Sequence, residues 1–117
     1  MEGVKKPSVA RQQLPREYFP LPLVLERTAP MQAVVKELFV FLSPTLGRIE
    51  VEAGFDTDYA SVPRFLWSVY PPDGDYTPAA VIHDALYWHQ ATREHGGHPV
   101  TREQADTCFL EAMEALA

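Results

Sequence analysis

The chain has 117 residues and a net charge of −6, with 46% hydrophobic and 22% charged residues. This length supports a single domain with one core, and the composition is that of a globular protein rather than a disordered or fibrous one. The negative charge offers no broad field for a phosphate backbone, so no nucleic acid partner is expected. Because Cys108 is the only cysteine, no intrachain disulfide can form, and a place in the core is expected for it. No segment has the roughly 20 apolar residues that a membrane span requires, so no span is expected.

The N-terminal part divides into an arm and the start of a folded domain. Residues 1–14 are polar and lack apolar periodicity, which is typical of a mobile segment or of one bound to a partner. Residues 19–27 carry prolines near their start, which exclude a helix and suit an edge strand. We therefore predict a flexible or partner-bound extended arm over residues 1–18 and one globular domain over residues 19–117.

The first half of that domain has the pattern of a β-sheet. Residues 34–42 mix β-branched and aromatic side chains, and within residues 48–52 Ile49 and Val51 alternate with polar residues. Residues 43–47 supply a turn. These patterns predict a small antiparallel sheet over residues 19–54, followed over residues 55–76 by an ordered loop and a short helix.

The second half has the pattern of two helices. Thr77 is a suitable N-cap with Pro78 at the first helical position, and this helix is expected to run to about Gln90. Thr101 and Gln104 form a capping-box pattern that begins a final helix, expected to end near residue 116. We predict an α+β fold in which the sheet is followed by an antiparallel helical hairpin over residues 77–117.

Two polar residues fall on the apolar faces of these helices. At about 100° per residue, His83 shares a face with Leu86 and Tyr87, and on the second helix Asp106 lies beside Phe109. Because a short connection favours antiparallel packing, we expect Asp106 to contact His83 and Tyr87. A histidine whose Nδ1 is held by a carboxylate is oriented as a base, with its other nitrogen free. The alternative is that His83 is a hydrogen-bonded core residue without catalytic function.

A second group of polar residues suggests a metal site. Asp84 points about 100° away from His83 on the helix, and its expected neighbours are Asp56 and Asp58. Carboxylates gathered in this way repel one another unless a cation lies among them. Oxygen ligands favour Ca²⁺ or Mg²⁺, while the inclusion of His83 allows Zn²⁺ or Mn²⁺. We therefore predict a divalent metal ion, Ca²⁺ or Zn²⁺, at these four residues; alternatively, Arg64 neutralises the aspartates without an ion.

The remaining histidines and the two tryptophans fit no catalytic or metal-binding motif. His89, His95 and His98 lie at a helix end and in a glycine-rich connection, and we expect them at the surface. Trp67 and Trp88 are expected to be core or interface anchors.

Three segments carry a resemblance to a known family. The segment GFDTDYASVPR within residues 52–67, together with residues 76–87 and 101–113, resembles the phage and prophage family known as domain of unknown function 1353. The resemblance covers most of the chain after about residue 23. It implies a small protein encoded among phage structural or lysis genes, and it implies no established activity.

A second resemblance covers only the two helices. His83, Asp84 and Tyr87 are placed as in the His-Asp-x-Cys-Tyr helix of secreted phospholipases A2. This similarity implies His83 as the base, Asp84 as a calcium ligand and Tyr87 as a hydrogen-bond donor to Asp106, which makes His83, Asp106 and Tyr87 the candidate catalytic residues. The chain departs from that family because it lacks the disulfide framework and the glycine-rich calcium loop.

Three functions are compatible with these features. The first is a virion-associated accessory or structural protein of a tailed phage, in the tail or baseplate, with other virion proteins as partners in an oligomeric assembly. Such a protein is made in the host cytoplasm and ends in the virion tail. The second is a small metal-dependent hydrolase, similar to phospholipase A2 or acting on the cell envelope. The third is a phage-encoded protein that binds a host protein.

Overall fold

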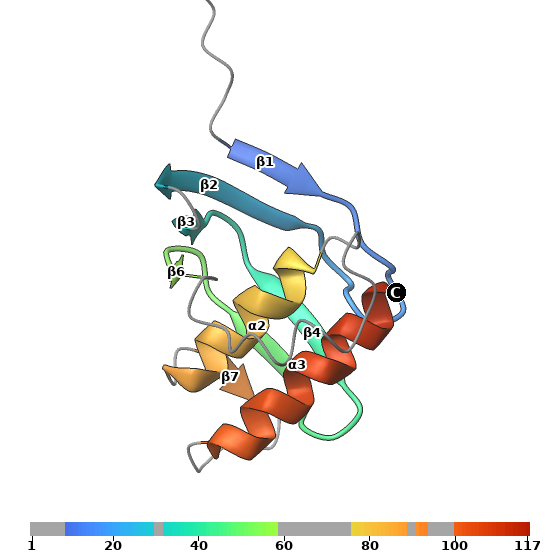
Figure 1. The fold of residues 1–117 in the computed structure, drawn as a ribbon. Coiled ribbons are helices and arrows are strands. Elements are labelled where there is room, and N and C mark those ends of the chain that lie inside the picture. The colour runs from blue at the N-terminus through green and yellow to red at the C-terminus, as the bar shows by residue number, and fades with distance from the viewer. Residues whose placement is uncertain (1–8, 30–31, 59–75, 89–90, 94–99) are drawn as a thin grey trace, which may run out of the picture.

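The computed structural model describes residues 9–29, 32–58, 76–88, 91–93 and 100–117. The described chain forms seven strands and two helices, which confirms the predicted α+β class (Figure 1). The strands are β1 (Val9–Gln12), β2 (Leu23–Ala29), β3 (Gln32–Val35), β4 (Phe39–Ser43), β5 (Gly47–Val51), β6 (Asp56–Asp58) and β7 (Ala91–Arg93). The helices are α2 (Thr77–Tyr87) and α3 (Arg102–Leu116), and they lie side by side as the predicted hairpin requires.

The strands form two antiparallel sheets, where the sequence predicted one small sheet. The first sheet has the order β1-β2-β3-β6, and the second has the order β4-β5-β7. The single strand predicted over residues 34–42 is therefore divided between two sheets. Lys36 and Glu37 are exposed between its two halves, and two consecutive charged residues interrupt the alternation that one continuous strand would need.

The described part of the predicted arm has a partner within its own chain. Strand β1 pairs with β2 in the register Val9 to Glu26 and Gln12 to Leu23. An ion pair between Arg11 and Glu37, 3.0 Å long, joins β1 to the segment before β4. Residues 9–12 of the predicted arm are therefore paired with a strand of their own chain.

The hairpin of β4 and β5 follows the prediction closely. Ser43 pairs with Gly47, whose φ of 80° suits a glycine at the end of the turn. Ile49 and Val51 are both fully buried, as their alternation predicted. Phe41 of β4 stacks on Phe19 at a ring distance of 4.9 Å, so the proline-rich segment before β2 contributes to the same core.

Helix α2 is buried on nearly every side, from Pro78 through Leu86. A helix that is apolar around its whole circumference belongs inside a protein. Two details of its prediction were wrong. Its N-cap is Tyr76, without a side-chain cap, and Thr77 is already helical. It ends at Tyr87, and the chain then forms β7, which pairs with β5 and was not predicted.

Helix α3 begins as predicted. The Thr101 side chain accepts a hydrogen bond from the Gln104 amide, and the Gln104 side chain accepts one from the Thr101 amide. This reciprocal capping box fixes the first turn through contacts within four residues. The buried face of the helix contains Ala105, Cys108, Phe109, Ala112 and Met113.

A polar contact fastens α3 to the β4–β5 turn. The Glu111 carboxylate accepts a hydrogen bond of 2.6 Å from the Ser43 hydroxyl and another from Thr45. Ser43 Oγ in turn accepts hydrogen bonds from the amides of Thr45 and Leu46.

Burial raises the pKa of the Cys108 thiol in α3 far above its usual range. The charge of Glu111 raises this pKa further, and a hydrogen bond with Ser43 lowers it. Cys108 is therefore a neutral core residue, as expected.

Within the described ranges, neither helix has the length and hydropathy needed to cross a membrane.

Candidate functional site

The predicted contact between His83 and Asp106 is present. Nε2 of His83 in α2 lies 2.8 Å from Oδ1 of Asp106 in α3. The His83 side chain is 5% exposed and that of Asp106 is 22% exposed. The ring also contacts Phe109 edge-on at 5.5 Å, so an aromatic side chain of α3 and a carboxylate of the same helix together fix its orientation.

The two ring nitrogens of His83 have roles opposite to those expected. Nε2, and not Nδ1, contacts the carboxylate, while Nδ1 is buried and has no hydrogen-bond partner among the described residues. When the ring is neutral and Nε2 carries the proton, Nδ1 is left as a buried acceptor. Any proton transfer by His83 would therefore have to use Nδ1. That atom has no exposed surface.

Tyr87 does not have the predicted role. It follows His83 by one turn of α2, and its ring lies 6.3 Å from the His83 ring, nearly parallel to it. Its side chain is 40% exposed. No hydrogen bond joins it to Asp106 among the described residues, so the expected donor to that carboxylate is absent. Tyr87 covers one side of the imidazole instead.

Asp84 is held by a residue that sequence analysis missed. Its Oδ2 accepts a 2.9 Å hydrogen bond from the hydroxyl of Thr57, and these side chains are 2% and 1% exposed. Thr57 is the central residue of β6, which pairs with β3. Because side chains alternate along a strand, Thr57 faces the helix while Asp56 lies on the other, exposed face. The expected approach of Asp56 to Asp84 is therefore wrong.

The metal site remains a prediction. No group of three or more His, Cys, Asp or Glu residues that could hold an ion occurs within the described part of the chain. Of the four predicted ligands, His83 and Asp84 are hydrogen-bonded to other side chains, and Asp56 is exposed. The side chain of Asp58, like residues 64, 67, 89, 95 and 98, lies outside the described structure.

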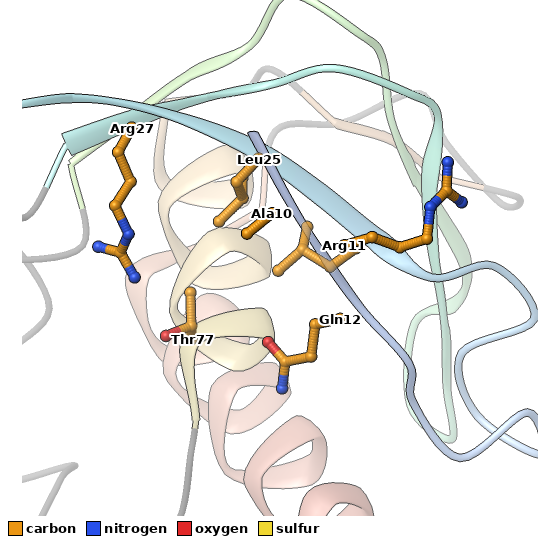
Figure 2. A pocket seen from close by; sticks show the side chains of 7 residues that line it. Ala10, Arg11, Gln12, Leu25, Arg27 and Thr77 are labelled. Carbon is orange, nitrogen blue, oxygen red and sulfur yellow. The ribbon is translucent and has the colours of Figure 1, made fainter. Parts of the chain in front are cut away.

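A separate pocket of about 220 Å³ lies at the opposite end of α2 from Tyr87. Figure 2 shows Gln12 of β1, Arg27 of β2 and Thr77 of α2 directed into it, and Arg11 directed away. It contains none of the residues that the sequence suggested for a site.

A family model described as "Protein of unknown function (DUF1353)" matches residues 33–117, well over half of the chain. The chain belongs to the DUF1353 family. No curated protein and no solved structure gives a match. None of the comparisons supports the local resemblance to the helix pair of phospholipases A2.

The DUF1353 match contains the whole of the described site. It begins within β3 and includes β6, α2 and α3, so Thr57, His83, Asp84 and Asp106 all lie inside it. Strands β1 and β2 lie outside it, although they complete the first sheet. The DUF1353 part of the chain therefore supplies both the His83–Asp106 contact and the Asp84–Thr57 contact.

Proposed function

We propose that this DUF1353 protein is a virion-associated accessory or structural protein of a tailed phage, located in the tail or baseplate. The observation that supports this best is the burial of His83. A catalytic histidine must present a ring nitrogen to its substrate, but Nε2 is bonded to Asp106 and Nδ1 has no exposed surface. In this proposal the pair fastens α2 to α3. The resemblance of the sequence to a phage family supplies the biological setting.

The proposed partners are other virion proteins in an oligomeric assembly. Strand β1 is the outermost strand of its sheet among the described residues, and Val9, Ala10 and Arg11 are exposed. An outermost strand offers backbone groups to an extended segment of a neighbouring protein. This arrangement suits a protein that is built into a larger particle.

The proposal is tested by quantitative mass spectrometry of purified particles. The protein is expected at a fixed copy number relative to the major tail protein, in particles purified to constant composition. A phage carrying His83→Leu is expected to incorporate the variant at the same copy number, because leucine fills the apolar site without acting as a base. Absence of the wild-type protein from the particles would refute the proposal.

A metal-dependent hydrolase is the second candidate, and the 2.8 Å contact between His83 and Asp106 favours it. A carboxylate on one ring nitrogen orients a histidine as a base. This candidate predicts hydrolysis of phospholipid vesicles or of purified cell envelope by the wild-type protein with Ca²⁺ or Zn²⁺. It also predicts loss of that activity with chelator and with His83→Leu. Activity that survives His83→Leu would rule out His83 as the base.

A further inference from the structure

A hollow of about 430 Å³ lies at the C-terminal end of α2, apart from the His83–Asp106 pair. Its lining comes from the turn after β5, the first residue of β6 and the C-cap of α2: Gly54, Phe55, Asp56 and Trp88. The hollow is wide and open to solvent. Gly54 has a φ of 99°, which a residue with a side chain rarely adopts. The next two residues in the chain, Phe55 and Asp56, line the hollow.

The aromatic side chains here are exposed to an unusual extent for their size. Trp88 is 60% exposed, and the neighbouring Tyr87 is 40% exposed. The two rings pack edge to face with their centroids 5.1 Å apart, so the indole of Trp88 contacts the Tyr87 ring. Of the two positions expected for Trp88, core or interface, its exposure excludes the core, and the indole borders an open hollow. An indole and a phenyl ring bordering the same hollow supply faces of negative potential.

The charges around the hollow are negative, like the potential at the faces of its aromatic rings. Asp56 is exposed and has no ion-pair partner among the described residues. The C-terminal end of a helix carries partial negative charge, and the last turn of α2 has no basic side chain. None of the four described residues that line the hollow is basic. A carboxylate, a helix C-terminus and two aromatic rings all favour a cation, and the rings favour one with methyl or methylene groups.

We propose that this hollow binds an organic ammonium group, with Trp88 contacting its carbon atoms and Asp56 compensating its charge. The ligand is either a free quaternary ammonium compound or the side chain of a lysine in a partner protein, since both carry a positively charged nitrogen next to methyl or methylene groups. The proposal does not depend on the virion role, because it concerns different residues from the His83–Asp106 pair.

The test follows the Trp88 indole N–H resonance of the full-length protein by NMR during ligand titration. Choline is compared with 3,3-dimethyl-1-butanol, which has the same shape without the charge, and N-acetyl-lysine amide represents the lysine source. Choline is expected to shift the resonance saturably, and the neutral alcohol is expected to bind at least about threefold more weakly. Saturable binding of the lysine derivative would identify a protein side chain as a ligand; binding of choline alone would identify a quaternary ammonium compound.

Variants distinguish binding of choline in the hollow from unspecific binding elsewhere on the protein. Asp56→Asn and Trp88→Leu are each expected to weaken choline binding about three- to fivefold; backbone resonances near Gly54 report binding where the indole is absent. Glu114→Gln and Tyr18→Leu change an exposed carboxylate and an exposed aromatic ring elsewhere, and they are expected to leave the affinity unchanged. Equal shifts with choline and the alcohol, or equal losses in the control variants, would overturn the proposal.

Discussion

Nε2 of His83 in α2 lies 2.8 Å from Oδ1 of Asp106 in α3, and this contact joins two helices whose buried faces are mostly apolar. A partner for a buried histidine N–H stabilises the fold, because an unpaired buried donor loses its hydration without compensation. Asp106 supplies that partner for Nε2. The same contact restricts the register in which α2 and α3 pack.

Substitution of Asp106 tests how much its contact with Nε2 of His83 contributes to the free energy of unfolding. Asp106→Ala is expected to lower the free energy of unfolding by about 1–3 kcal/mol, because Nε2 is left without a partner. Asp106→Asn retains an acceptor oxygen and is expected to cost less than about 1 kcal/mol. Urea denaturation measures both changes. Glu114→Ala, an exposed change on the same helix, is expected to remain within about 0.5 kcal/mol of the wild type.

The hydroxyl of Thr57 is expected to stabilise the buried carboxylate of Asp84. Thr57→Val keeps the shape of the side chain and removes only the donor, so we expect a loss of about 1–3 kcal/mol in the free energy of unfolding. The control is Thr107→Val on the exposed face of α3, where the same change is expected to have an effect below about 0.5 kcal/mol. Equal effects at the two positions would show that the hydroxyl of Thr57 contributes nothing specific.

The thiol of Cys108 is expected to react only when the protein opens. Burial raises the pKa of Cys108, so the folded state holds a neutral thiol where the unfolded state ionises near its ordinary value of about 8.5. Alkylation by iodoacetamide at pH 8 should therefore be slow in buffer and fast in urea. Rapid alkylation under native conditions, at the rate of a free thiol, would contradict the buried position.

The raised pKa of Cys108 also predicts the direction of a pH effect. The folded state binds this proton more tightly, so the associated stability is fully present below the unfolded pKa and is lost as the pH rises above it. Above about pH 8.5, wild-type stability is expected to fall more steeply than that of Cys108→Ala, by up to about 1.4 kcal/mol per pH unit. Parallel pH profiles for the two proteins would contradict this prediction.

The sequence predicted those features that depend on contacts close in the chain. The capping box of Thr101 and Gln104 lies within four residues, and its pattern alone located the start of α3. The contact between His83 and Asp106 is distant in sequence, yet helical periodicity and antiparallel packing were sufficient to predict it. Periodicity gave no information on which ring nitrogen would face the carboxylate, because that depends on the side-chain rotamer.

The sequence did not predict features that depend on distant pairing. Strands β6 and β7 have three residues each, too few for a recognisable alternation, and each exists through its partner, β3 or β5. Once β6 was read as a loop, there was no basis for placing Thr57 rather than Asp56 opposite Asp84. For Trp88 the sequence left a core and an interface position open, because α2 was expected to continue past this residue to about Gln90 and instead ends at Tyr87.

The central claim is that His83 and Asp106 stabilise the packing of α2 on α3 through their mutual contact. A double-mutant cycle with His83→Leu, Asp106→Ala and the double variant, measured by urea denaturation, tests it most directly. We expect a coupling free energy of about 1–2 kcal/mol, with the Asp106→Ala loss largely absent once His83 is leucine. Additive effects, with a coupling below about 0.3 kcal/mol, would contradict the claim.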